Sequence, residues 1–454
     1  MNFDILSQNL VIYVSIIVSI CAYYLILSLY KTGTKVKLTH KKDKLRYKKF
    51  NQIYFLVALA LAILIAYLIW AFVQQATDSP VPGSFILMCL PFTLLICVLI
   101  ISIFIKKAFI PFACVTLVLS LLFSLLIIND YYRFYPTLGE VFGNTNTQAY
   151  KESLNSVTVH YTVDTNQQTL NNESIQKSLE SIDSSPTAGK VYAINIPGTI
   201  SKFKPRTEYV YIPAIYNSPA KIKLPVIVLT AGVPGIPANW LGLGLQNIMD
   251  HFASTHFGIT PLVFVADSTG TINNDTECVN SSKGNVETYL TQDVPNYIKS
   301  NFNVDTSPKN WAIGGLSLGG MCSIMLTLRH PDVYNYFIDL GGELGPEDGS
   351  KQHTIDTLFG GSESAWAAHQ PSLLLQDNKY PNIGGYFGDG EQDTRDVVDA
   401  IEQLNQQSKK AGINSVLEII NGAHTFNVWS QTYKDALPWI SNRIGATQCS
   451  SSCI

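Results

Sequence analysis

The segment of the chain that most clearly could carry out chemistry contains a serine between two glycines. Residues 311–326 read WAIGGLSLGGMCSIML, which places Ser317 in a Gly-x-Ser-x-Gly pentapeptide between Gly315 and Gly319. A strand-like apolar run precedes it and a helix-like stretch follows, the context in which this pattern sets a serine on a sharp strand-to-helix turn. Glycines relieve crowding at such a turn. Ser317 is therefore predicted to be a nucleophile, the alternative being a glycine-rich turn without chemistry.

One histidine has the position in the chain that a base for Ser317 requires. A serine hydroxyl is a weak nucleophile unless a base takes its proton, and in this type of site the order is serine, carboxylate, histidine. The chain has eight histidines, and only His424 follows the last strand end that carries carboxylates. Its segment, VLEIINGAHTFNVW, reads as a strand, a glycine turn and a helix start. We predict that His424 is the general base.

The carboxylate that would orient this histidine is expected in GDGEQDTRD, directly after a strand. Such turns commonly read Gly-x-x-Asp, and counting from Gly390 gives Asp393 as the preferred acid. Asp396 and Glu391 are the alternatives, and the remaining carboxylates, Asp389 among them, are expected to be solvated. The acid would hold the imidazole in the correct tautomer and stabilise its charged form.

An oxyanion formed during acyl transfer needs two N–H donors. One is expected from Leu318, the residue after the nucleophile, and the other from the loop that follows an early strand. The segment LPVIVLTAGVPG fits that loop, with its turn at Gly232-Val233. Pro234 has no N–H, so Val233 is the predicted second donor.

Short apolar runs alternate with longer periodic stretches after residue 190, which predicts a mostly parallel sheet covered by helices on both faces. Active sites in such sheets lie beyond the carboxyl ends of the strands. The expected strands are 209–213, 225–229, 261–266, 311–314, 336–340, 383–387 and 416–420. The expected helices are 240–255, 286–301, 318–329, 395–411 and 428–443.

The composition points to a second, very different region. The chain is 47% hydrophobic but only 14% charged, and this excludes a disordered protein and argues against a fully soluble one. The apolar excess is concentrated in four uncharged runs, each long enough to cross about 30 Å of hydrocarbon as a helix. These predicted membrane helices are 10–30, 53–73, 84–105 and 108–128. A cleaved signal peptide is not expected, because the first nine residues carry no Lys or Arg.

The positions of the basic residues predict the orientation of this anchor. Nine Lys and Arg side chains lie between residues 31 and 49, and Lys106 and Lys107 lie in the turn between the third and fourth runs. Both loops are expected to be cytoplasmic, so that the N-terminus and everything after residue 128 lie outside. The basic loop more simply contacts anionic lipid headgroups than nucleic acid. The predicted domains are a membrane anchor (1–128), a polar extracytoplasmic spacer (129–190), a catalytic domain (191–445) and a tail (446–454).

The chain has eight cysteines, four of which lie in the external part: Cys278, Cys322, Cys449 and Cys453. An even number in an oxidising compartment suggests disulfides. Three pairings are open, and the simplest is Cys278 with Cys322 and Cys449 with Cys453. No Cys or His spacing matches a zinc signature, so neither a metal nor another cofactor is expected.

Several segments together resemble the esterase D and mycolyltransferase-like branch of the α/β-hydrolases. They are YVYIPAIYNSPAKIKLPVIVLTAGVPG, the serine segment continuing to RHPDVYNYFIDLGGELGP, and YFGDG followed by HTFNVW. The resemblance covers about residues 209–440 and implies the α/β-hydrolase fold. It also implies acyl-ester chemistry through an acyl-Ser317 intermediate, released to water in esterases or to a sugar hydroxyl in mycolyltransferases. The four-helix anchor is similar to that of membrane-attached hydrolases of this type in actinobacteria.

Two features depart from the family pattern. The glutamate that mycolyltransferases place further past the strand has no match here, and the opening turn lacks the usual histidine before its glycine, reading Thr230-Ala231-Gly232. We therefore expect an extracytoplasmic membrane-anchored serine ester hydrolase acting on an acyl ester of a lipid or cell-envelope component. The alternatives are an acyltransferase of mycolyltransferase type and a non-catalytic membrane-bound binding protein with this fold.

Overall fold

The computed structural model describes residues 188–217, 223–256 and 258–446, together with Leu64, Tyr67 and Leu68. Within these residues, a twisted eight-stranded sheet has the order β1-β2-β4-β3-β7-β8-β9-β10. Strands β3, β4, β7, β8, β9 and β10 are parallel, whereas β2 pairs antiparallel with both β1 and β4. The strands are β1 (Lys190–Ile194), β2 (Glu208–Ile212), β3 (Val226–Thr230), β4 (Leu262–Ala266), β7 (Trp311–Leu316), β8 (Tyr336–Leu340), β9 (Gly384–Gly390) and β10 (Asn414–Ile420).

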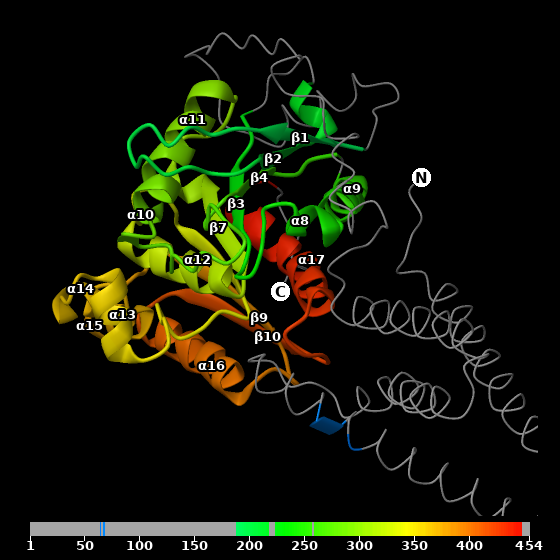
Figure 1. The fold of residues 1–454 in the computed structure, drawn as a ribbon. Helices are drawn as coiled ribbons and strands as arrows, with labels where there is room; N and C mark the ends of the chain where they lie inside the picture. The colour runs from blue at the N-terminus through cyan, green and yellow to red at the C-terminus, as the bar shows by residue number, and fades with distance from the viewer. Residues whose placement is uncertain (1–63, 65–66, 69–187, 218–222, 257, 447–454) are drawn as a thin grey trace, which may run out of the picture. The chain divides into compact units, whose positions relative to one another are not determined.

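Helices cover both faces of the sheet, so the predicted mostly parallel α/β architecture is confirmed (Figure 1). On one face, α8 (Asn239–Gly242), α9 (Leu245–Thr255) and α17 (Phe426–Arg443) pack on alternate strand residues such as Ile227 and Val263. The other face is covered by helices that pack on residues such as Val228 and Phe264. They are α10 (Val286–Thr288), α11 (Val294–Asn301), α12 (Leu318–Arg329), α15 (Pro371–Asp377) and α16 (Arg395–Lys410).

The predicted strands are present within a few residues, because continuous apolar runs bounded by Pro or Gly are typical of strands buried on both faces. Strand β1 was not predicted, and it forms one edge of the sheet. The expected helix 240–255 is divided into α8 and α9 by Gly244, which has a φ of 85°. The expected helix 286–301 contains a π-helical turn, η4 (Tyr289–Asp293).

Three helices between β8 and β9 were not predicted: α13 (Lys351–Leu358), α14 (Glu363–Ala367) and α15. All three are short, and they lack the long apolar period that identifies a helix. Their starts are marked locally instead. The hydroxyls of Ser350 and Ser362 accept hydrogen bonds from the first turns of α13 and α14, and Pro371 begins α15. These are ordinary N-terminal signals.

The four predicted membrane runs lie outside the described residues, apart from Leu64, Tyr67 and Leu68, which are helical and exposed. Among the residues that the structure describes, no helix has the length and apolar character needed to cross a bilayer. The proposed spacer and tail fall outside the described residues except at their boundaries with the catalytic domain.

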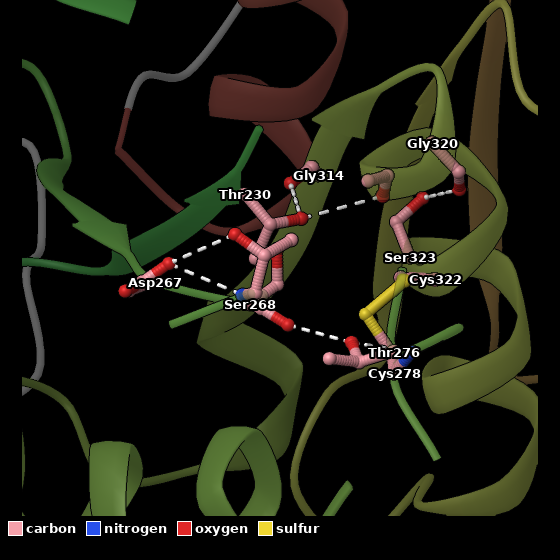
Figure 2. The surroundings of a disulfide bond; sticks show 11 residues. Thr230, Asp267, Ser268, Thr276, Cys278, Gly314, Gly320, Cys322 and Ser323 are labelled. Atoms are coloured by element: carbon pink, nitrogen blue, oxygen red, sulfur yellow. Dashed lines mark hydrogen bonds between the residues drawn. A yellow bond between two sulfur atoms is a disulfide. The ribbon is translucent and has the colours of Figure 1, made fainter. Parts of the chain in front are cut away.

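A disulfide between Cys278 and Cys322 joins the loop after β4 to helix α12, as one of the predicted pairings requires (Figure 2). Both cysteines are fully buried. The same loop is held by the Thr276 hydroxyl, which donates to the carbonyl of Ser268 at 2.6 Å. Because Cys322 lies one turn after the start of α12, the disulfide ties this helix, which follows Ser317, to the loop after β4, the second strand along the sheet from β7. Cys449 and Cys453 lie outside the described residues.

A buried carboxylate anchors the α13–α15 region to the rest of the domain. Glu287 of α10 accepts hydrogen bonds from Arg329 Nε at 2.8 Å, His330 Nε2 at 2.8 Å and His369 Nε2 at 3.1 Å. Burial would raise the pKa of Glu287, but these hydrogen bonds outweigh it and hold the pKa well below its ordinary value. Glu287 is thus a structural anion that joins α10, the end of α12 and the segment after α14.

Replacing Glu287 with glutamine is expected to lower the free energy of unfolding by about 2 kcal/mol at pH 7, because Arg329 loses a charged acceptor in a buried site. A depressed pKa contributes stability that is complete above the unfolded value, 4.5, and is lost as the pH falls towards the folded value. Urea unfolding at pH 7 and pH 3 checks this, since the difference between wild type and variant should shrink at pH 3. An equal difference at both pH values would contradict it.

Candidate active site

The turn between β7 and α12 presents Ser317 at the carboxyl edge of the sheet. Ser317 has φ 55° and ψ −126°, a strained conformation that costs of order 1–3 kcal/mol and is typical of functional turns. Its N–H donates to the carbonyl of Leu340 at 2.8 Å, which fixes the turn to β8. A Cβ on Gly315 would lie 2.3 Å from the backbone of Gly319. Both glycines of the pentapeptide are therefore needed for the close crossing that exposes the serine.

The structure brings Ser317, His424 and Asp393 together in one chain of hydrogen bonds. His424 Nε2 lies 3.0 Å from Ser317 Oγ, and His424 Nδ1 lies 2.6 Å from Asp393 Oδ2. Since a carboxylate only accepts, the proton of the neutral imidazole lies on Nδ1, which leaves Nε2 to accept from the serine hydroxyl. The Asp393 side chain is 1% exposed and that of His424 is 20% exposed. The carboxyl group of Asp393 is thus shielded, while the imidazole of His424 remains accessible.

Two turns from different strands meet to place the acid and the base side by side. The N–H groups of Glu391 and Gln392, after β9, donate to the carbonyls of Ile420 and Gly422, after β10, at 2.8 and 2.7 Å. The turns can approach this closely because a Cβ on Gly390 would lie 2.3 Å from the carbonyl oxygen of Gly422. The glycines in these two turns therefore allow Asp393 and His424, which are 31 positions apart in the chain, to form a hydrogen bond.

The other carboxylates of this turn have different environments. Asp396 is exposed in the first turn of α16, and Glu391 is exposed and accepts from the Asn421 amide at 2.9 Å. Of the carboxylates in this turn, it is Asp393 that accepts the hydrogen bond from His424 Nδ1. The expectation that Asp389 is solvated is wrong, because it is 0% exposed. Strand β9 extends to Gly390, so Asp389 is a strand residue and not a turn residue.

The two predicted oxyanion donors lie on either side of Ser317. Leu318 begins α12, and the loop of Gly232 and Val233 passes so close that a Cβ on Gly232 would lie 2.9 Å from Cβ of Ser317. Within the described residues, the Val233 N–H and the Leu318 N–H make none of the backbone hydrogen bonds that form in turns, loops and helix caps. Both donors therefore remain candidates for binding the oxygen of a substrate.

Arg206 holds the loop that carries Val233. Its side chain makes a bidentate ion pair with Asp267 at the end of β4, at 2.9 and 2.6 Å, and also donates from Nη1 to the carbonyl of Gly235 at 3.0 Å. Burial would raise the pKa of Asp267, but the Arg206 contacts outweigh it and lower the pKa. This arginine was not singled out by sequence reasoning, because its partners come from distant strands.

Within the described part of the chain, one group of metal-ligating residue types is compact enough to hold an ion: Asp389, Asp393 and His424, with one ligand atom of each within 4.8 Å of the others. However, Nδ1 of His424 is already bonded to Asp393, and its Nε2 contacts Ser317. The arrangement therefore fits a proton relay better than a metal site.

A cavity of about 640 Å³ lies elsewhere, lined by residues that include Lys309, Asn335 and Ile383. These residues precede β7, β8 and β9, so the cavity lies at the amino edge of the sheet. Because the serine, histidine and acid all follow strand ends, this cavity is separate from their site.

Comparison with known proteins agrees with this geometry. The family model described as "Putative esterase" matches residues 204–440, which contain the three hydrogen-bonded residues and both strand-end turns. The chain belongs to the Esterase family. This family is part of the α/β-hydrolase superfamily, and this Esterase-family chain is an enzyme of the esterase and acyl-transfer type.

Sequence relatives extend beyond the catalytic domain. An uncharacterized protein of Corynebacterium glutamicum is 33% identical over 335 residues, which are 72% of this chain and 75% of the relative. The diacylglycerol acyltransferase/mycolyltransferase Ag85A of Mycobacterium leprae is 24% identical over 192 residues, 36% of this chain. The match spans 57% of that mycolyltransferase. Among solved structures, an S-formylglutathione hydrolase from Agrobacterium tumefaciens is 16% identical with a TM-score of 0.49, covering 58% of this chain and 98% of that one.

Proposed function

We propose that this Esterase-family enzyme is a serine ester hydrolase that acts through an acyl-Ser317 intermediate. The observation that carries the proposal is the hydrogen-bonded series from Ser317 Oγ to His424 and on to Asp393, at 3.0 and 2.6 Å. A nucleophile, a base and an orienting acid are thus within reach of one another at the carboxyl edge of the sheet, the combination that acyl transfer requires.

The proposed acylation step follows from these distances. Ser317 Oγ attacks the carbonyl carbon of the ester while His424 Nε2 takes the hydroxyl proton. The negative charge that develops on the carbonyl oxygen is held by the N–H groups of Val233 and Leu318. When the tetrahedral intermediate collapses, the C–O bond to the alcohol breaks, and His424 gives its proton to the leaving oxygen. Asp393 stabilises the imidazolium formed between these events.

Water completes the proposed reaction. A water molecule loses a proton to His424 and attacks the acyl carbon, and the second tetrahedral intermediate releases the carboxylic acid and restores Ser317. If an alcohol attacks in place of water, the same residues transfer the acyl group to a hydroxyl. The mycobacterial relatives are diacylglycerol acyltransferase/mycolyltransferases, which makes acyl transfer to a sugar or envelope hydroxyl the second candidate.

We further propose that residues 1–128 anchor the enzyme in a membrane and that its catalytic domain lies outside the cytoplasm. The support is the four uncharged runs and the placement of Lys and Arg between them. A buried disulfide in the catalytic domain agrees with an oxidising compartment. An anchored site of this type would have lipid or cell-envelope esters within reach, and these are the substrate class that we propose.

Product analysis separates the two candidate reactions. Full-length enzyme is incubated with a p-nitrophenyl acyl ester, with and without trehalose as an acceptor, and the products are identified by mass spectrometry. Free acid as the main product in both cases supports hydrolysis, whereas acyl-trehalose as the main product replaces it with transfer. Absence of p-nitrophenol release and of labelling by a fluorophosphonate would favour a non-catalytic binding protein.

A further inference from the structure

A second carboxyl group lies behind the Asp393–His424 pair and has no role in the mechanism above. Asp389 is 0% exposed, and one of its oxygens lies within 4.8 Å of both an oxygen of Asp393 and a ring nitrogen of His424. The two carboxyl groups are therefore neighbours, and the pKa of Asp389 is raised by burial and by the charge on Asp393. Neither oxygen of Asp389 accepts a hydrogen bond of normal geometry within the described residues, and the nearby Gly390 N–H only partly offsets the rise in the pKa of Asp389.

The hydrogen bonds made by Asp389 and Asp393 indicate which of these two carboxyl groups is ionised and which is protonated. Asp393 accepts from the Thr394 N–H at 2.6 Å and from His424 Nδ1 at 2.6 Å, so both of its oxygens have donors that stabilise a negative charge. Within the described residues, Asp389 has only the nearby Gly390 N–H, which does not meet either of its oxygens at normal hydrogen-bond geometry. Two adjacent buried carboxyl groups cannot both ionise at ordinary cost. Burial first, and then the charge on Asp393, raises the pKa of Asp389 well above its ordinary value.

The surroundings of Asp389 are buried and contain two further acidic side chains. A Cβ on Gly341 would lie 2.9 Å from Trp429 Nε1, 3.3 Å from Asp389 Oδ1 and 3.4 Å from His424 Cε1. Gly341 therefore lies close to all three of these side chains, and a larger residue would crowd them. The titratable groups that face Asp389 are Asp393 from the turn after β9, His424 from the turn after β10 and Asp339 from β8. Asp339 is also fully buried, and burial raises its pKa to about 7.

We propose that Asp389 stays protonated in the working enzyme and donates a hydrogen bond to Asp393, so that Asp389 is a positioning residue for the acid and the base. This proposal rests on the proposed function, because it assigns a role relative to His424 as the base. The donated hydrogen bond holds the Asp393 carboxylate in the orientation that meets Nδ1. It also withdraws negative charge from Asp393, so that protonated His424 is stabilised less. The neutral imidazole, which is the form that accepts the serine proton, is thereby favoured.

Two substitutions at Asp389 separate this role from simple packing. Asparagine keeps a neutral donor of the same shape, whereas leucine fills the space but donates nothing. Asp389→Asn is expected to keep kcat/KM within about threefold of wild type near pH 7 and to extend the plateau to higher pH, because it cannot ionise. In Asp389→Leu, kcat/KM is expected to fall at least tenfold, and the acid limb of its pH profile to move up by about one pH unit, since protonated His424 then faces a fuller charge.

The experiment is the pH dependence of kcat/KM for a p-nitrophenyl ester, measured on full-length wild type, both Asp389 variants and Asp396→Asn as an exposed-carboxylate control. A thermal melt of each protein identifies any variant that fails to fold. Equal loss of activity in the Asn and Leu variants, with profiles that keep the wild-type shape, would overturn the proposal. Activity lost on treatment with EDTA and restored by Zn²⁺ would replace the shared proton with a metal ion.

The outcome is distinguishable from failure of the proposed function. If wild type hydrolyses the ester and Ser317→Ala does not, the nucleophile assignment stands, and the Asp389 variants test the positioning role alone. If wild type itself has no Ser317-dependent activity, the proposed function fails before Asp389 is considered. In that case the Asp389 proposal fails with it, because no base remains for Asp389 to position.

Discussion

Replacing Ser317 with alanine is expected to lower kcat for a p-nitrophenyl ester by roughly 10⁴- to 10⁶-fold, because removal of the nucleophile leaves only binding and oxyanion stabilisation. The fold should survive the change. Ser317 contributes its backbone N–H to the carbonyl of Leu340, and alanine keeps that donor. Its side chain is half-buried and its hydrogen bond runs to His424. Initial rates with saturating ester, on purified full-length protein, measure the effect.

The control for this experiment is Ser364→Ala, which removes an exposed serine hydroxyl from α14. That variant should hydrolyse the ester at the wild-type rate, and both variants should melt at the wild-type temperature within a few degrees. Residual activity of Ser317→Ala above about 1% of wild type, once contaminating esterases have been excluded with an unrelated membrane preparation, would contradict the role of Ser317.

The second large effect is expected at the acid. Asp393→Asn should lower kcat by about 10⁴-fold, because an amide can donate to Nδ1 and so favours the imidazole tautomer that cannot accept the serine proton at Nε2. The Asp393 oxygen that meets His424 lies at 2.6 Å. An asparagine there keeps the shape of the site but not the charge that stabilises the imidazolium. The pH profile of the residual activity and the thermal melt show whether chemistry or folding is affected.

Matched controls lie in the same turn. Glu391→Gln and Asp396→Asn each remove one carboxylate within a few residues of Asp393, but both of these side chains are exposed. They should stay within about twofold of the wild-type kcat. If either control lost activity as severely as Asp393→Asn, the acid would have been assigned wrongly. If Asp393→Asn kept wild-type activity, the hydrogen bond to His424 would have no part in catalysis.

The central sheet could be predicted from the sequence because its parallel strands are buried on both faces. Such strands read as continuous apolar runs, as VIVLT of β3 and LVFVA of β4 do. Strand β1 reads KVYAI and is only partly buried. It directly follows a polar stretch, so its sequence does not stand out as a continuous apolar run. Helices α13 and α14 were missed because side chains that cap a helix are common in loops too, and only tertiary contacts such as those of Glu287 with His369 decide the matter.

Some residues of the candidate site could be predicted from the sequence and others could not. Ser317 and His424 follow from motif and chain order, and Asp393 follows from its spacing from Gly390. The environment of Asp389 could not be predicted, since the two glycines beside it made the end of β9 ambiguous and its partner lies across a turn. Arg206 could not be predicted for a related reason. Its partners Asp267 and Gly235 lie 61 and 29 residues further along the chain.

Labelling with a fluorophosphonate tests the central claim most directly, because the reagent phosphonylates a serine only where a base activates it. Intact membranes carrying the full-length protein are treated with the probe, digested and examined by mass spectrometry for the modified residue. We predict one adduct per chain, located on Ser317, and none when His424 is replaced by alanine. An unlabelled wild-type protein, or an adduct on any other serine, would contradict the assignment of this site as a serine esterase.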